Sequence, residues 1–148
     1  MDAQLQALLD RAEIQNLLAR YAAALDEHDW ELLATCFTAD AEYRFAHMGD
    51  KDGVEAIVEV CRASLEPLDA SQHLVGSPHV EIDGDRAHSR CPFQAQHVRR
   101  GADGGRNYLV GGTYVDELLR TDEGWRIERR ELQRVWTDGN PAVLGRVE

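Results

Sequence analysis

Long apolar runs, paired cysteines and an excess of positive charge are all missing from this chain of 148 residues. Its apolar runs extend over only a few residues, so no membrane span is expected. The first residues are charged and do not resemble a signal peptide, which predicts a cytoplasmic protein. Against 16 Lys and Arg stand 27 Asp and Glu, a net charge of −11 that would repel nucleic acid and anionic lipid.

Motifs for several common chemistries are also missing. Cys36, Cys61 and Cys91 are widely spaced and form no CxxC pair, so they are interpreted as buried thiols rather than as a disulfide framework. The six histidines lack short metal-ligand spacing, and no metal site is expected. No GxSxG, GxGxxG, P-loop or HExxH sequence occurs, which leaves serine hydrolase, dinucleotide, nucleotide and zinc-protease functions without a motif.

What is present is ordinary globular composition, with 43% apolar residues in a length that suits one domain over residues 1–148. Residues 2–25 repeat apolar side chains at steps of three and four, which predicts an amphipathic helix. Asp29 suits the N-cap of a short second helix that ends near Phe37. Asp52 and Glu55 resemble a capping box for a third helix. The apolar positions of the first and third helices are Leu5, Leu8, Leu9, Ile14, Leu17, Leu18, Tyr21 and Leu25, and Val54, Ile57, Val58 and Cys61.

The second half of the chain has the pattern of strands separated by turns. A first strand is expected at residues 41–46, and residues 79–82 and 87–99 flank Asp83-Gly84 as a hairpin. Long strands follow at residues 107–120 and 125–136. Helices followed by a meandering, mostly antiparallel sheet predict an α+β fold. Helices on one face of such a sheet leave room for a pocket between the layers.

Two residues could carry proton-transfer chemistry. Asp26 lies at the edge of the apolar stripe of the first helix, so its carboxylate points either into a cavity or into solvent beside Glu27 and Asp29. His73 lies where a loop becomes the first strand of the main sheet, and a carboxylate on one ring nitrogen would leave the other nitrogen free as a base. From the sequence alone, His73 could equally be a plain surface histidine.

Inward positions can be read from strand alternation. In residues 87–99 one alternate set is small or apolar and includes Phe93 and His97, so His97 is expected to face inward, either at a pocket or bonded within the core. In the last strand Trp125 and Ile127 share a face, but the next apolar position breaks the parity, which predicts a β-bulge. The bulge would turn Arg130 inward, although both Arg129 and Arg130 could instead lie on the solvated face.

Four segments resemble the SnoaL-like branch of the nuclear transport factor 2-like superfamily. These segments are AEIQNLLARYAAALDEHDWELLATCFTADAEY, GVEAI, SQH and GWRIERRELQRVW, and the resemblance covers nearly the whole chain. It implies a cone-shaped fold in which three N-terminal helices pack on a curved, mixed sheet whose open end holds a small, mostly apolar ligand. It also implies a homodimer or homotrimer.

Within this family the chain looks most like the lyases that need no cofactor: scytalone dehydratase, bile acid dehydratase and hexachlorocyclohexane dehydrochlorinase. The resemblance implies a catalytic pair of Asp26 and His73, with Tyr21 and Tyr43 as further catalytic residues. It also implies roles for His97 and Arg130 at the substrate, and we count Phe93 and Tyr114 as further substrate-binding candidates. Ala22 or Tyr21 stands where the dehydrochlorinases have a helix lysine, which favours dehydration over dehydrohalogenation.

The expected function is therefore a dehydratase-like lyase acting on a small hydrophobic carbonyl or polycyclic compound. An isomerase on the same scaffold would move a proton without losing a group. The sequence is also compatible with a ligand-binding module without chemistry and with a small subunit of a ring-hydroxylating dioxygenase.

Overall fold

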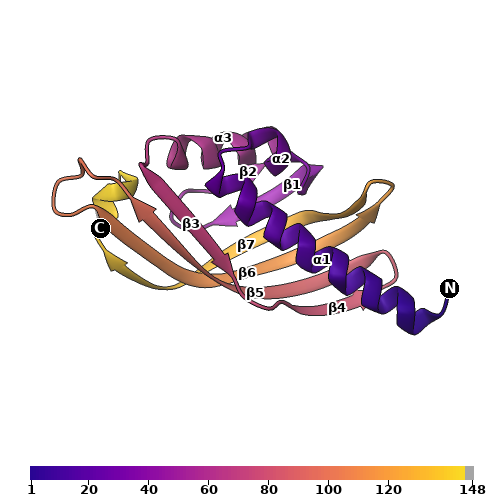
Figure 1. Cartoon of the computed structure of the whole chain (residues 1–148). Coiled ribbons are helices and arrows are strands. Elements are labelled where there is room, and N and C mark those ends of the chain that lie inside the picture. Colours follow the sequence, from indigo (N-terminus) through magenta and orange to yellow (C-terminus); the bar gives the residue numbers. More distant parts are fainter. Residues whose placement is uncertain (146–148) are drawn as a thin grey trace.

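Three helices lie on the concave side of one curved seven-stranded sheet (Figure 1). The computed structural model describes residues 1–145. Its helices are α1 (Ala3–Asp26), α2 (Trp30–Ala34) and α3 (Val54–Leu65), and a short 3-10 helix, η1 (Pro141–Leu144), follows the last strand. The strands are β1 (Phe37–Phe45), β2 (Lys51–Asp52), β3 (Ala70–Val75), β4 (His79–Asp83), β5 (Arg86–Val98), β6 (Asn107–Thr121) and β7 (Gly124–Gly139). The α+β class predicted from the sequence is confirmed.

The sheet is mixed, with strand order β2-β1-β7-β6-β5-β3. Strand β4 pairs with the first half of β5, and β3 pairs with its second half. Strands β1 and β7 run parallel, whereas the hairpin-linked strands β5, β6 and β7 are antiparallel. Strand β3 lies at an edge of this order, so one side of its backbone is left for contacts outside the sheet. None of the helices within residues 1–145 is long and apolar enough to cross a membrane.

Helix α1 begins where the sequence predicts, but its first turns are not covered. Asp2 caps the helix by accepting a hydrogen bond from the backbone N–H of Gln4 at 2.7 Å. The predicted helix is confirmed, but Leu5, Leu8 and Leu9 at its start are 47–65% exposed. The reason is geometric, because the N-terminal turns of α1 project past the sheet (Figure 1).

Two further boundaries differ from the prediction. Asp29 does cap α2, but the helix ends at Ala34 and Phe37 already opens β1. Asp52 does not cap α3, because it lies in β2 and its carboxylate accepts a hydrogen bond from Arg44 Nη1 at 2.8 Å. The residue before α3 is Gly53, whose φ of 91° suits glycine because it lacks a β-carbon.

The hairpin and the bulge are confirmed. The turn between β4 and β5 consists of Gly84 and Asp85, one residue later than the predicted Asp83-Gly84, and Gly84 supplies the positive φ of 60°. Along β7, Ile127 faces Leu118 of β6 while Arg129 faces Glu117, so one extra residue is inserted in β7. As a result, Ile127 and Arg130 are both fully buried although they are three residues apart.

The outer face of the sheet carries exposed apolar side chains. Leu74 is 58% exposed, Val135 69% and Trp136 40%. The ring of Trp136 lies directly over Gly111 of β6, where a side chain would collide with it. The homodimer or homotrimer implied by the family resemblance stays a prediction.

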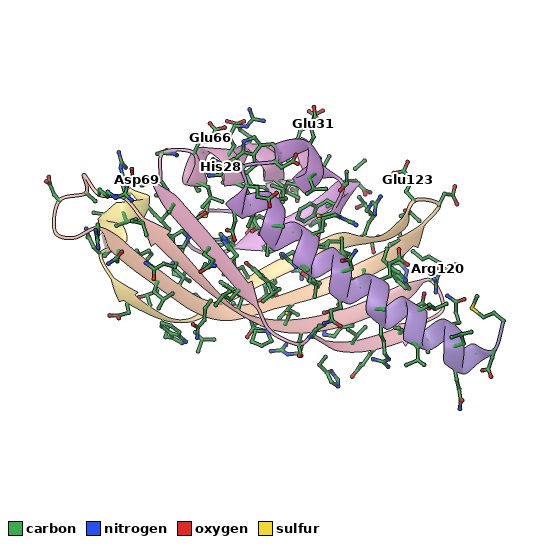
Figure 2. The ribbon with its side chains drawn as sticks, in the orientation of Figure 1. His28, Glu31, Glu66, Asp69, Arg120 and Glu123 are labelled. Atoms are coloured by element: carbon green, nitrogen blue, oxygen red, sulfur yellow. The ribbon has the colours of Figure 1, made fainter. Side chains whose placement is uncertain are left out.

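A partly buried ion pair connects α1 to the end of β6, with the Asp10 side chain 4% exposed and that of Arg120 30% exposed. Arg120 of β6 donates from Nη1 and Nη2 to the two carboxylate oxygens of Asp10, at 2.6 and 2.9 Å (Figure 2 labels Arg120). Trp125 Nε1 donates to the same carboxylate at 3.1 Å. The bonds from Arg120 lower the pKa of Asp10 from 3.8 to about 2, against the opposing effect of burial.

This depressed pKa predicts an acid-sensitive contribution to stability. The unfolded chain binds more protons at this site than the folded chain between about pH 4 and pH 2, so the contribution is complete above this window and is lost as the pH falls through it. We expect Asp10→Asn to reduce the unfolding free energy at neutral pH by about 1–2 kcal/mol. Urea unfolding at several pH values measures this. As the pH falls below 4, the free energy of unfolding should decrease less in this variant than in the wild type. Parallel curves would contradict the assignment.

Candidate active site

The end of α1 and the edge strand β3 bring Asp26 and His73 together across 47 residues of sequence. The backbone N–H of His73 donates to both carboxylate oxygens of Asp26, at 3.1 and 2.9 Å. This N–H points away from β5, on the side of β3 that the sheet leaves open. The His73 ring is bound by the same carboxylate, with 2.7 Å between Nδ1 and Asp26 Oδ1.

This geometry sets the tautomer of His73. A carboxylate accepts hydrogen bonds, so Nδ1 carries the proton and donates it to Asp26. In the neutral ring Nε2 is then unprotonated and able to accept a proton. The side chain of His73 is 7% exposed and that of Asp26 22% exposed, so the pair is largely shielded from water.

A small cavity lies between the helices and the sheet, and His73 lines it. Its volume of about 60 Å³ holds a few water molecules, and a cyclic ligand requires the lining side chains to move apart. Most of the lining is aromatic or aliphatic, and no charged lysine, arginine, aspartate or glutamate within residues 1–145 belongs to it. The lining residues are Tyr21, Leu25, Tyr43, Phe45, Met48, Cys61, Ser64, Leu65, His73, Phe93, Ala95, His97, Val110, Tyr114, Leu132 and Leu144.

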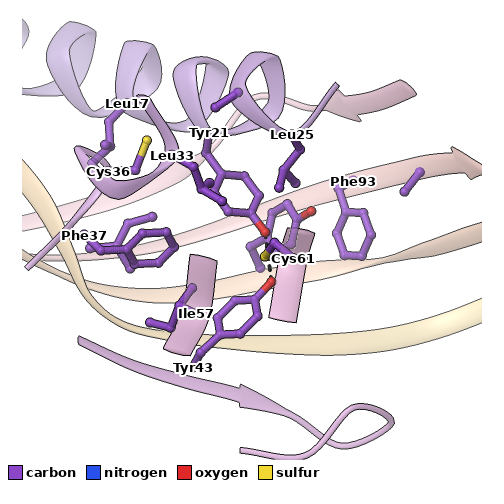
Figure 3. Packing of buried hydrophobic residues seen from close by; sticks show 14 of the residues in the cluster. Leu17, Tyr21, Leu25, Leu33, Cys36, Phe37, Tyr43, Ile57, Cys61 and Phe93 are labelled. Atoms are coloured by element: carbon purple, nitrogen blue, oxygen red, sulfur yellow. Dashed lines mark hydrogen bonds between the residues drawn. The ribbon is translucent and has the colours of Figure 1, made fainter. Parts of the chain in front are cut away.

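Two tyrosine hydroxyls meet at the wall of this cavity. Tyr21 from α1 and Tyr43 from β1 approach with 2.8 Å between their hydroxyl oxygens, the dashed contact in Figure 3. Burial raises the pKa of both tyrosines well above the ordinary value, so both keep their protons at neutral pH. One hydroxyl donates to the other, and the second proton of the pair is available to an acceptor in the cavity.

The other expected substrate-binding side chains on β5 and β6 also line the cavity. Phe93 stacks on Tyr114 with 4.1 Å between ring centroids and 10° between planes. The ring of His97 is 5.9 Å from that of His73 and perpendicular to it. His97 Nδ1 lies 3.0 Å from the carbonyl oxygen of Tyr108, which can only accept, so Nδ1 donates there.

Arg130 lies elsewhere. Its side chain is fully buried, yet it does not line the cavity. Its guanidinium lies behind the cavity wall, against the rings of Tyr21 and Tyr114. The expected contact of Arg130 with a substrate stays a prediction, and in this structure Tyr21 and Tyr114 line the cavity in its place. Arg129 points outward and is 41% exposed, with ion pairs to Glu42 and Glu131.

Several lining residues were not singled out from the sequence. Met48, Ser64 and Leu144 come from a turn, from α3 and from η1, and no local pattern marks such residues as neighbours of β3. Cys61 was expected as a buried thiol, and burial raises its pKa to about 12, so it stays protonated. Within residues 1–145 no group of three or more His, Cys, Asp or Glu is placed to hold a metal ion.

Known proteins match this chain along most of its length. A family model described as a SnoaL-like domain matches residues 6–131. An uncharacterized protein of Mycobacterium tuberculosis is 35% identical over 122 residues, which is 82% of each chain. A crystal structure of a protein from Kribbella flavida is 29% identical with a TM-score of 0.83, covering 89% of this chain and 95% of that one. A type 2 hexachlorocyclohexane dehydrochlorinase, LinA, is 20% identical with a TM-score of 0.84, covering 93% of both chains.

The Asp26–His73 contact predicts a specific ring tautomer that NMR can measure. In the wild type, at a pH where the ring is neutral, we expect His73 to carry its proton on Nδ1. In Asp26→Ala the acceptor is lost, and the proton should redistribute toward Nε2, as in a free imidazole. Spectra that correlate ring nitrogens with ring protons distinguish the two forms. His79, which is exposed on β4, serves as the internal reference. An Nε2-protonated His73 in the wild type would contradict the geometry.

Proposed function

The chain belongs to the SnoaL-like domain family, and from this premise we propose that it is a cofactor-independent lyase of the dehydratase type. The observation that carries the proposal is the 2.7 Å contact between Asp26 and the Nδ1 of a histidine that lines an apolar cavity. The likeness to a dehydrochlorinase adds support at the level of the scaffold, because both reactions remove a proton and a leaving group from neighbouring carbons.

His73 is the base in this mechanism. Its Nε2 takes a proton from a carbon beside a carbonyl group, and the Asp26 carboxylate stabilises the imidazolium that forms. The pair of hydroxyls on Tyr21 and Tyr43 donates a hydrogen bond to the carbonyl oxygen as it gains enolate charge. Preorganised donors of this kind contribute about 3–4 kcal/mol to transition-state stabilisation.

The leaving group then departs from the next carbon. The electrons of the enolate form the new C=C bond while the C–O bond breaks, and the proton held by His73 passes to the departing hydroxyl to give water. Because His73 returns this proton, the departure of the hydroxyl needs no second acid. His97 lines the cavity beside His73 and contacts the substrate in this mechanism, while its Nδ1–H stays bonded to the carbonyl oxygen of Tyr108. The atoms balance as a β-hydroxy carbonyl compound that yields an unsaturated carbonyl compound and water.

The substrate class follows from the lining. Aromatic rings and aliphatic side chains favour a small, apolar compound, and an uncharged lining favours a neutral one. Met48 has an unbranched, adaptable side chain that can shift as a ring enters. We therefore take small cyclic β-hydroxy ketones as the test compounds.

An isomerase is the second candidate, because the same base and the same hydroxyl donors also serve a proton shift without a leaving group. The observation that favours it is the single dedicated base, His73, which could take a proton and return it to a different carbon. Product mass separates the two reactions, since only dehydration removes water.

Substitution of His73 tests the proposed base. We expect His73→Ala to fold normally and to lower the turnover of an accepted β-hydroxy ketone by about 10²- to 10⁴-fold, the usual contribution of a positioned base. His79→Ala removes an exposed histidine outside the cavity and should keep full turnover. Mass spectrometry follows both the loss of water and the exchange of the hydrogen beside the carbonyl in D₂O. A fully active His73→Ala variant, or a wild type inert in both assays across the series, would contradict the proposal.

A further inference from the structure

The guanidinium of Arg130 packs against two aromatic rings, Tyr21 and Tyr114, which meet edge to face beside it. Its Cζ lies 4.2 Å from the ring centroid of Tyr21 and 4.0 Å from that of Tyr114, well within cation–π range. The side chain has no exposed surface. A buried cation in this position acts on both rings through a low-dielectric interior, where charge interactions are strong.

The negative partner of Arg130, Asp116, binds two of the three guanidinium nitrogens. Nε and Nη2 both donate to Asp116 at 2.7 Å, and Asp116 is itself fully buried. The third nitrogen, Nη1, is buried and has no hydrogen-bond partner within residues 1–145. A buried ion pair is often no more stable than a well-packed apolar pair, so stability alone gives weak reason for this arrangement.

The charge lies next to the groups that would meet a substrate oxygen. Strand pairing places Arg130 opposite Asp116 on one side and opposite Tyr43 on the other, in one row across β6, β7 and β1. Tyr21 stacks on the guanidinium and bonds the hydroxyl of Tyr43. Burial raises the pKa of both tyrosines, and the positive charge of Arg130 opposes that rise in each of them.

We propose that Arg130 is a positioning residue, which acts from behind the wall to make the Tyr21–Tyr43 hydroxyl pair a stronger hydrogen-bond donor toward a substrate oxygen that gains negative charge. This inference rests on the proposed lyase function for its role in catalysis. Through the two tyrosines, the charge of Arg130 stabilises an enolate in a cavity that no lysine or arginine within residues 1–145 lines. A neutral substrate therefore enters without passing a cationic side chain. In this role Arg130 acts without lining the cavity.

The acidity of Tyr21 can be measured without any substrate. Difluorotyrosine incorporated at position 21 ionises closer to neutral pH than tyrosine, and fluorine NMR follows its titration. Two charge-free pairs remove the cation while keeping the site filled: Arg130→Gln with Asp116→Asn, and Arg130→Met with Asp116→Val. Circular dichroism checks that each variant is folded, and either folded pair is sufficient. We expect the pKa of the label to rise by about one unit or more in both, as loss of a nearby opposite charge predicts.

Arg130→Lys, with Asp116 retained, is the control for packing. Lysine keeps the positive charge but lacks the planar fork of arginine, so the label should stay closer in pKa to the wild type than to the charge-free pairs. An unchanged pKa in the charge-free pairs would overturn the proposal, as would a lysine variant that rises as far as they do. Both results are independent of turnover, so they are separate from a failure of the lyase assignment, which the His73→Ala assay detects.

Discussion

The carboxylate of Asp26 is the contact on which the rest of the site depends. It accepts the backbone N–H of His73 and the ring Nδ1–H of the same residue, so it fixes the end of α1 to the edge of the sheet and orients the imidazole. Tyr21 is five residues earlier on the same helix. The position of α1 on β3 therefore sets the separation between the base and the hydroxyl of Tyr21, while Tyr43 is placed by β1.

The charges of the site lie one layer behind the surface of the cavity. Asp26 is behind His73, and the pair of Arg130 and Asp116 is behind Tyr21 and Tyr114. His73, Tyr21 and Tyr114 face the cavity, and each has a charged side chain in contact with it from behind. In a dry interior such an arrangement stabilises charge that develops during a reaction while leaving a neutral ground state undisturbed.

The periodicity of apolar residues along helices and strands predicted much of the fold. How deeply a given side chain is buried depends on tertiary packing, which periodicity does not show. The 3.6-residue repeat gave the length of α1, and the broken parity between Trp125, Ile127 and Leu132 gave the bulge that buries Arg130. The same repeat could not show that the first turns of α1 extend past the sheet. A capping pattern at Asp52 could not show that this residue joins β2. No spacing rule relates Asp26 to His73, so only the family resemblance suggested their pairing. Nor could any spacing show that Arg130 lies against Tyr21 and Tyr114 instead of lining the cavity.

The cooperation between Asp26 and His73 is the central claim, and a double-mutant cycle on the rate of hydrogen exchange beside the carbonyl tests it most directly. Asp26→Asn, His73→Gln and the double variant would be compared with the wild type under one set of conditions. If Asp26 acts through His73, the double variant is no slower than His73→Gln alone, because the carboxylate has no ring left to orient. Rate losses that multiply would contradict this account and show two groups that act independently.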